Sequence, residues 1–220
     1  MFKPKKFVDL SLDLSDDTPI YPGDPKPHIT VATTIEREGY NLHHVHIGSQ
    51  SGSHVDAAYH FLASGERIDE SDLSLFIGTG LVIPALGKGE QEPIVLDEVE
   101  EYVECANPGN IVLFHTGWSR YAGTDKFFSH PYVHIDVIDA LLAKGVRTFC
   151  IDCINIDITG GDAFPAHDAI AAVQGIIAEN LTNFDAIDFR DPLVCLFPLK
   201  LVGCDGSPVR AVAMQLESNL

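Results

Sequence analysis

The sequence predicts an α/β fold, with a mixed β-sheet and flanking helices in a single domain over residues 1–220. Short runs that alternate apolar and polar residues, or that are wholly apolar, recur along the chain and are typical of strands. Amphipathic helical patterns lie between these runs, at 95–105 and 136–144. We find no internal repeat and no linker that would separate two domains, and a chain of 220 residues can bury one sizeable core.

The first part of the chain is predicted to be strands around a proline-rich loop. Residues 7–12 alternate apolar and polar side chains and predict a first strand. Residues 16–27 carry four prolines and a glycine, which exclude a helix or a central strand and indicate an ordered loop or arm. Residues 28–35 and 40–47 are predicted to be strands separated by a charged turn at 36–39.

Three histidines, His43, His44 and His46, lie close together in the 40–47 strand. They could belong to a metal site, or they could be polar side chains on the wet face of a half-exposed strand. We favour the second interpretation, because no carboxylate stands nearby at a matching position.

The middle of the chain is predicted to alternate helical segments and buried strands. A short helical piece is expected at 71–76, a buried strand at 78–85, a surface helix at 95–105 and a central strand at 111–115. The tail over 192–212 is predicted to form two strands around a hairpin turn at its Cys-Asp-Gly-Ser sequence.

A helix followed by a strand is predicted after residue 135. The helix over 136–144 is closed by Gly145, and residues 146–151 return as a strand. Cys150 and Cys153 have the C-x-x-C spacing, but redox motifs of this form open a helix, whereas these cysteines lie in a strand pattern. We therefore interpret them as buried thiols rather than as a redox or zinc pair.

Residues 164–183 allow two arrangements. A single long helix would separate His167 and Glu179 by about 18 Å, at 1.5 Å per residue. Alternatively, Gly175 ends the helix and residues 176–179 return as a strand. Only the second arrangement would let the two side chains meet at one site.

Composition excludes several kinds of partner. The chain has 14 Lys and Arg against 32 Asp and Glu, a formal net charge of -18, which argues against nucleic acid and anionic membrane surfaces. No apolar run approaches the roughly 18 residues of a membrane span, and no apolar signal core follows the basic start. Five scattered cysteines indicate reduced, buried thiols. We therefore expect a cytoplasmic protein that acts on a small molecule.

The stretch 50–61 (QSGSHVDAAYHF) carries the densest chemistry. In an extended chain, side chains alternate, so Gln50, His54, Asp56 and His60 would lie on or near one side. In a helix, Asp56 would point about 200° away from His54, and the glycine and serines before His54 also disfavour a helix. An imidazole and a carboxylate two residues apart can hold one small cation together.

If this stretch converges with His167 and Glu179, the result is a candidate metal site. Imidazole nitrogens and carboxylate oxygens are ligands for zinc, or for manganese where oxygen ligands dominate. A bound divalent cation lowers the pKa of water toward about 7, and a free imidazole can move a proton to a leaving group, which is the chemistry of hydrolysis at a carbonyl. The alternative is that each histidine is an ordinary core or surface residue. Their concentration in one short stretch favours a site.

Residues 51–61 also closely resemble the signature H-x-G-T-H-x-D-x-P-x-H of the cyclase family, which includes bacterial kynurenine formamidases and related metal-dependent hydrolases. The resemblance continues in order along nearly the whole chain. Its further matches are Asp9-Leu10-Ser11, Tyr21-Pro22-Gly23-Asp24, Thr116-Gly117-Trp118, Gly145-Val146, Ile151-Asp152, His167, Glu179-Asn180-Leu181, Pro198-Leu199-Lys200 and Asp205-Gly206. So many ordered matches are specific for the family and say little about the substrate.

The resemblance implies a swivelling β/β/α domain that assembles as a homodimer or homotetramer. It implies that His54 and Asp56 hold one metal ion. A second ion would be held by Asp56, His167 and Glu179. By the same resemblance, His60 is the proton donor and acceptor rather than a ligand.

Three positions depart from the family signature. Gln50 stands where the formamidases have their first metal-binding histidine, Ser53 replaces threonine, and Ala58 replaces a proline, which loosens the loop before His60. A glutamine ligates through its amide oxygen and is a weaker ligand than imidazole, so we expect a lower preference for zinc, with manganese or a single ion as alternatives.

The predicted function is metal-dependent hydrolysis of an amide (C–N) bond in a small aromatic or cyclic substrate, as in the arylformamidase reaction on N-formylkynurenine in tryptophan catabolism. Hydrolysis of a lactone or a cyclic imide is the alternative within the family. A non-catalytic member that binds a small ligand is the alternative from another class, and Gln50 favours it. Phe61, His115 and Trp118 are candidates for the wall of the substrate pocket, with packing at strand ends as the alternative.

Overall fold

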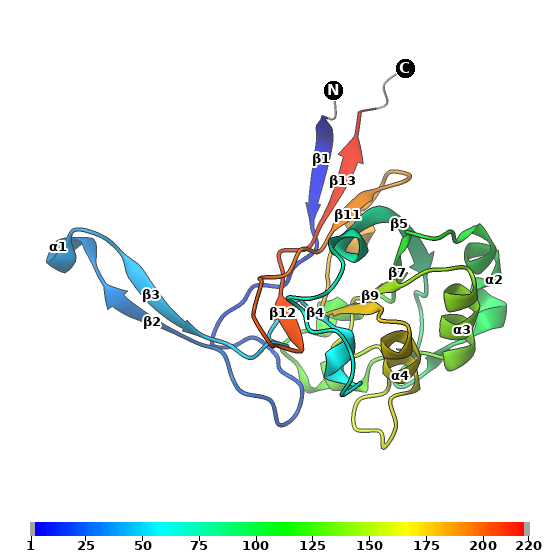
Figure 1. Ribbon diagram of the computed structural model, residues 1–220, viewed down its shortest axis with the longest axis horizontal. Coiled ribbons are helices and arrows are strands. Elements are labelled where there is room, and N and C mark those ends of the chain that lie inside the picture. The colour runs from blue at the N-terminus through cyan, green and yellow to red at the C-terminus, as the bar shows by residue number, and fades with distance from the viewer. Residues whose placement is uncertain (1–2, 218–220) are drawn as a thin grey trace.

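A computed structural model describes residues 3–217 of the chain (Figure 1). It is built on one large sheet with strand order β1-β13-β11-β5-β7-β9-β10-β4-β12. The strands are β1 (Pro4–Asp9), β2 (His28–Thr33), β3 (Leu42–His46), β4 (His54–Asp56), β5 (Ile77–Pro84), β6 (Pro93–Ile94), β7 (Ile111–His115), β8 (Tyr132–Val133), β9 (Thr148–Ile151), β10 (Ile176–Glu179), β11 (Leu193–Cys195), β12 (Gly206–Pro208) and β13 (Val212–Leu216). The α-helices are α1 (Ile35–Glu38), α2 (Leu96–Cys105), α3 (Ile135–Ala143) and α4 (Pro165–Ala172). The 3₁₀ turns are η1 (Ala58–His60), η2 (Leu73–Phe76), η3 (Trp118–Tyr121), η4 (Asp125–Ser129) and η5 (Phe184–Ala186).

The sheet is mixed, as expected. Its centre, β5-β7-β9-β10, is parallel, and antiparallel strands flank it on both sides. Strands β7, β9 and β10 are buried on both faces, which explains why their sequences are largely apolar rather than alternating. The α/β fold class and the mixed sheet with flanking helices are therefore confirmed.

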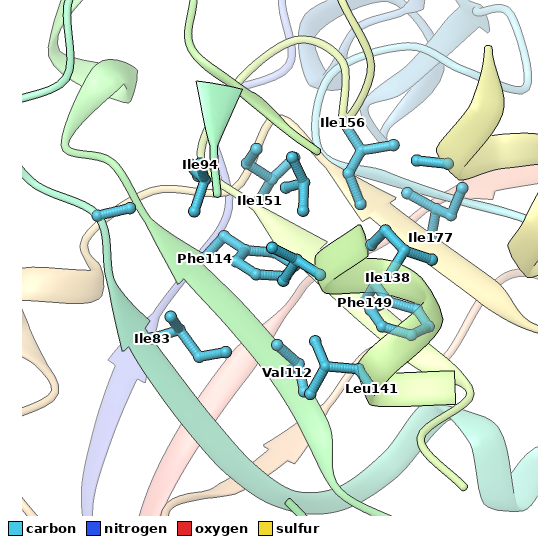
Figure 2. Packing of buried hydrophobic residues seen from close by; sticks show 14 of the residues in the cluster. Ile83, Ile94, Val112, Phe114, Ile138, Leu141, Phe149, Ile151, Ile156 and Ile177 are labelled. Carbon is cyan, nitrogen blue, oxygen red and sulfur yellow. The ribbon is translucent and has the colours of Figure 1, made fainter. Parts of the chain in front are cut away.

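Helices α2, α3 and α4 gather on one side of the sheet (Figure 1). Alternate residues of β7 and β9 point to this side, where Val112, Phe114 and Phe149 pack with Ile138 and Leu141 of α3 (Figure 2). The intervening residues contribute to a second cluster on the opposite face, together with side chains of β11 and β13. Two apolar clusters thus hold the sheet from both faces.

The predicted helices and their ends agree with the structure. In α2, Val99 and Val103 are buried, so its acidic residues lie on the outer side. Helix α3 ends before Gly145, whose φ of +83° is the left-handed conformation that glycine adopts readily. Residues 176–179 form β10, which confirms the arrangement in which the chain turns back after α4.

Two local predictions are wrong. Within 50–61 only His54–Asp56 is a strand, because 49–53 turns and 58–60 is a 3₁₀ turn. The tail does not form a hairpin at 204–207. Strand β11 pairs with β5 and β13, whereas β12 crosses to the other edge of the sheet and pairs with β4. A turn-like sequence does not reveal which strands its neighbours will join.

Strands β2 and β3 form a separate hairpin that stands away from the body of the protein (Figure 1). The three histidines lie on a strand with exposed polar side chains, as favoured, but every residue of β3 is exposed, so both of its faces are exposed rather than one. The arm also exposes large apolar side chains, among them Val31, Tyr40, Leu42 and Val45.

All five cysteines are free thiols, and burial raises the pKa values of Cys150 and Cys153 above the ordinary range of a thiol. Over residues 3–217, none of the helices has the length and apolar character that crossing a membrane requires.

Candidate metal centre and active-site cavity

Strand β4 positions two of the predicted ligands. Side chains alternate along a strand, so His54 and Asp56 share one face while Val55 packs into the core on the other. Strand β10 runs antiparallel beside β4 with Glu179 directly opposite His54. The pairing register of two strands therefore brings an imidazole and two carboxylates together.

Helix α4 supplies the fourth predicted ligand. Pro165 stands in its first turn, and the chain turns sharply after Ala172, with Gln174 at a φ of +55°, before entering β10. The backbone N–H groups of Ala166 and His167 both donate to the carboxylate of Asp157, at 3.0 and 3.1 Å. This contact fixes the first turn of α4 and points His167 toward β4.

The four side chains form one compact cluster. His54 Nε2 lies 3.5 Å from Asp56 Oδ1 and 3.7 Å from Glu179 Oε2. His167 Nε2 lies 3.7 Å from Asp56 Oδ2 and 3.5 Å from Glu179 Oε1. His54, Asp56 and Glu179 each offer a ligand atom, and these three atoms lie within 4.8 Å of one another. The structure thus brings His54, Asp56, His167 and Glu179 together.

The hydrogen bonds around the cluster fit a bound cation. Both carboxylate oxygens of Asp56 are buried without a hydrogen-bond partner, and burying a carboxylate in this way is costly unless a charge compensates it. His54 donates its Nδ1 proton to the Gly52 carbonyl at 2.8 Å, and His167 donates its Nδ1 proton to Asp157 at 2.7 Å. Each imidazole therefore turns its Nε2 lone pair toward Asp56 and Glu179, as metal-binding histidines do.

Electrostatics favour the same interpretation. Burial and the neighbouring Asp56 carboxylate raise the pKa of Glu179 to about 8. Burial opposes protonation of His167, but its hydrogen bond to Asp157 and the nearby carboxylates of Asp56 and Glu179 outweigh it and raise its pKa to about 10. The chain alone thus retains protons in the cluster, because two adjacent buried carboxylates need positive charge nearby.

His60 lies beside this cluster, at the end of the 3₁₀ turn that follows β4. Its Nδ1 is 2.8 Å from Asp205 Oδ2, and the side-chain amide of Gln50 contacts both groups. Burial lowers the pKa of His60, but the charge of Asp56 and the hydrogen bond with Asp205 outweigh it and raise the pKa overall. The Gln50 amide oxygen is buried without a partner.

A cavity of about 220 Å³ opens above the cluster. Its polar end is formed by His54, His60, His167 and Glu179 together with Gln50. Aromatic rings form another part of its wall: Phe61 lies 4.2 Å from the His167 ring and 5.1 Å from Phe164, measured between ring centroids. The cavity is thus polar at one end and aromatic beside it, which suits a small molecule with an aromatic part and a polar reacting group.

The three predicted wall residues have different positions. Phe61 lines the cavity. Trp118 is only 2% exposed, packs in the core against Tyr121 and donates its indole N–H to the Lys126 carbonyl. His115 lies with its ring against Phe184. Neither Trp118 nor His115 is among the residues lining the cavity, so both match the alternative of packing at strand ends.

Several cavity residues were not singled out from the sequence as site residues. Tyr21 and Asp24 reach the cavity from the proline-rich loop, and Ile154, Asn155 and Phe164 reach it from the segments after β9 and before α4. The Tyr-Pro-Gly-Asp run was visible as part of the family resemblance. The other three follow no spacing rule, because the segment between β9 and α4 that carries them is neither helix nor strand.

Comparison with known proteins places this geometry in a family. The model of the Cyclase family, described as "Putative cyclase", matches residues 8–158, which is more than half of the chain. The chain belongs to the cyclase family. This confirms the resemblance drawn from residues 51–61 and the matches around them.

Relatives of this family member cover nearly its full length. The kynurenine formamidase of Geobacillus thermodenitrificans is 27% identical over 211 residues, covering 96% of this chain and 98% of that protein. The kynurenine formamidase of Bacillus cereus is 28% identical over 217 residues, with the same coverage.

Solved structures share the fold. An isatin hydrolase bound to the product analogue thioisatinate superposes with a TM-score of 0.89 at 22% identity, covering 96% of this chain and 93% of that one. A protein described as a potential metal-dependent hydrolase with cyclase activity superposes with a TM-score of 0.75 at 23% identity, covering 96% and 98%.

Proposed function

We propose that this protein is a metal-dependent hydrolase that cleaves an amide (C–N) bond in a small aromatic or cyclic substrate, as an arylformamidase does. One observation carries the proposal: a buried His, Asp and Glu cluster, with both oxygens of Asp56 unpartnered, lies at the polar end of a cavity with aromatic rings in its wall. The names of its relatives support it, since N-formylkynurenine and isatin both contain an amide attached to an aromatic ring.

His54, Asp56, His167 and Glu179 would hold the cation, with the unpartnered amide oxygen of Gln50 as a further candidate. Zinc or manganese suits this mixture of nitrogen and oxygen donors, as one ion or two. Such an ion supplies an acidified water and a Lewis acid for the scissile carbonyl.

The protein's own side chains complete the proposed mechanism. Phe61 and Phe164 would hold the aromatic part of the substrate and exclude water from it. His60, beside the cluster and on the cavity wall, would take up on its Nε2 the proton that the attacking water loses and pass it to the leaving nitrogen. Without this proton the departing group would leave as a strongly basic anion, so we expect His60 to affect turnover much more than binding.

The test begins with metal-free protein to which zinc or manganese is restored, assayed on N-formylkynurenine, aryl formamides and isatin. Wild type should turn over at least one of these with metal, and His60→Ala should reduce its kcat by about 10²–10⁴-fold. Absence of turnover with either metal on every substrate would refute the proposal, as would full activity of His60→Ala.

Simple lactones belong in the same assay, because the alternative within the family is hydrolysis of a lactone or cyclic imide. The other alternative is a non-catalytic protein that binds a small ligand, and it is favoured by Gln50, a weaker metal ligand than histidine. Metal analysis of wild type and Gln50→His tests this point. Unchanged metal content and preference would remove Gln50 from the set of ligands.

We further propose that the protein is cytoplasmic and assembles as a homodimer or homotetramer. The β2–β3 arm supports the assembly, because an isolated two-stranded hairpin is marginal in water and this one exposes Leu42 and Val45. Light scattering after size exclusion should give a mass of two or four chains, and Val45→Asp should lower it. A monomeric wild type would refute the assembly.

A further inference from the structure

The carboxylate of Asp205 is the centre of a hydrogen-bond network on the wall of the cavity. Its Oδ1 accepts from the Ser49 hydroxyl at 2.7 Å. Its Oδ2 accepts from the Gln50 amide at 2.9 Å and lies 2.8 Å from His60 Nδ1. These donors hold the pKa of Asp205 well below its usual range, with the His60 hydrogen bond as the largest cause.

The backbone around Asp205 is fixed against β4. The Asp205 carbonyl accepts from Ala57 N–H at 2.9 Å, and the next residue, Gly206, pairs with Asp56. A side chain at Gly206 would not fit, because a Cβ atom there would lie 2.5 Å from the Val55 carbonyl oxygen and 2.6 Å from Gln50 Nε2. Asp205 is therefore attached to the same strand that carries His54 and Asp56, and it cannot move independently of them.

The network selects one proton arrangement. An ionised carboxylate only accepts hydrogen bonds, so Gln50 must turn its NH₂ group toward Asp205, and His60 must carry its proton on Nδ1. No hydrogen bond of the described residues uses His60 Nε2, so this nitrogen is free to take up a proton and to release it. The opposite tautomer would place the Nδ1 lone pair 2.8 Å from a carboxylate oxygen, which is repulsive.

We propose that Asp205 is the positioning residue that holds His60 as the Nδ1–H tautomer, with Nε2 directed to the reacting group, and that the Gln50 NH₂ group holds the Asp205 carboxylate in place. This inference rests on the proposed function for the role of His60. It goes beyond that function because it gives Asp205 and Gln50 the role of positioning His60. The structure supplies a reason for glutamine at position 50: its NH₂ group donates a hydrogen bond to Asp205, and its amide oxygen is buried without a hydrogen-bond partner.

The first experiment compares Asp205→Asn with wild type on a substrate that wild type hydrolyses. Asparagine keeps the size of the side chain but can donate to His60 Nδ1, which stabilises the wrong tautomer. A comparable Asp-to-Asn change in a serine-protease triad costs about 10⁴-fold in kcat. Because His60 is partly exposed rather than held in that triad, we expect a loss of about 10²–10⁴-fold in kcat with KM changed less than about threefold.

Two controls separate positioning from structure and charge. Asp188→Asn removes the same charge at an exposed site that pairs with Lys6, and it should retain the wild-type kcat. Ser49→Ala removes the hydrogen bond to the other oxygen of Asp205 and should cost less than about tenfold. An Asp205→Asn variant with wild-type kcat, or one in which only KM rises, would overturn the inference.

The second experiment needs no turnover. Long-range ¹H–¹⁵N spectra of protein labelled at histidine, with His60 assigned by its loss in His60→Ala, report the tautomer directly. Wild type should show His60 protonated on Nδ1, and Asp205→Asn should shift it toward Nε2. A wild-type His60 protonated on Nε2 would overturn the inference even if the hydrolase is active. The predicted tautomers would support it even if every tested substrate fails.

Discussion

Asp157 orients His167, a candidate metal ligand, although Asp157 itself lies outside the cluster of candidate ligands. Its Oδ2 lies 2.7 Å from His167 Nδ1 and also accepts the His167 backbone N–H, while Oδ1 accepts that of Ala166. Asp157→Asn keeps the volume but replaces one acceptor oxygen by an NH₂ donor. If the remaining oxygen takes the place of Oδ1, the hydrogen bond from the Ala166 N–H survives, and both hydrogen bonds from His167 are lost.

Two effects should follow from Asp157→Asn. Removing the hydrogen-bond partner of a metal-binding histidine weakens metal binding by about 10–100-fold, or about 1.4–2.8 kcal/mol. Losing a charge and a hydrogen bond at the first turn of α4 should lower the free energy of unfolding of the metal-free protein by about 1–2 kcal/mol. Competition with a chromogenic chelator measures the first effect, and urea unfolding in EDTA measures the second.

Asp168→Asn is the matched control for this prediction. The Asp168 side chain is exposed, lies in the same first helical turn and loses the same charge, yet it makes no hydrogen bond or ion pair with the His167 side chain. It should change stability by less than about 1 kcal/mol and leave metal affinity unchanged. Equal metal affinities for wild type and Asp157→Asn would refute the claim that Asp157 orients a ligand. A loss of metal affinity in Asp168→Asn would attribute the effect to general charge.

Three further outcomes follow from the structure. Removal of the metal with EDTA should abolish turnover. It should also lower the free energy of unfolding by about 2.7 kcal/mol relative to protein at a metal concentration one hundred times Kd. Identical urea midpoints with and without EDTA would contradict a cation in the cluster. Burial lowers the pKa of His130 to about 4, so the unfolded chain binds a proton near pH 6.5 before the folded chain does. The free energy of unfolding should therefore fall by about 2 kcal/mol from pH 7 to pH 5 through His130. His130→Gln should not show this loss when urea unfolding is measured at the two pH values. An equal fall in wild type and His130→Gln would exclude His130 as its cause. Gly65→Ala would place a Cβ atom 2.5 Å from the carbonyl carbon of Ala58. We therefore expect the free energy of unfolding, measured by thermal unfolding, to fall by about 1–3 kcal/mol, and kcat to fall because His60 moves. An unchanged melting temperature would show that the backbone of this turn can shift to accept the methyl group.

Part of the candidate metal cluster could be predicted from the residues themselves. His54 and Asp56 share a face by the alternation of a strand. A continuous helix would have carried Glu179 about 18 Å from His167, and the expected break occurs after Ala172, with Gln174 in the left-handed conformation. The pairing of β4 with β10 brings the two stretches together, and only the family resemblance indicated that they meet.

The network around His60 could not be predicted in the same way. Asp205 is 145 residues from His60, and it arrives through β12, a strand expected to pair within the tail but found beside β4. The positions of Trp118 and His115 escaped prediction for a related reason. His115 is the last residue of β7 and Trp118 follows it in η3, and whether a side chain there turns to the cavity or to the core depends on η4 and η5, which pack against these residues from later in the chain.

The pairing of the first strand with the last has a consequence for synthesis of the protein. Strand β1 pairs with β13, and the hydrogen bond from Ser49 to Asp205 joins residues 156 positions apart. A nascent chain that ends before residue 205 has neither β12 nor β13, so it cannot close the sheet or hold His60 through Asp205. Folding dominated by such distant contacts is slow, and until these residues are synthesised β4 and β1 remain open edges that can pair with another chain. The arrangement of His60 therefore depends on one of the last segments of the fold to be made.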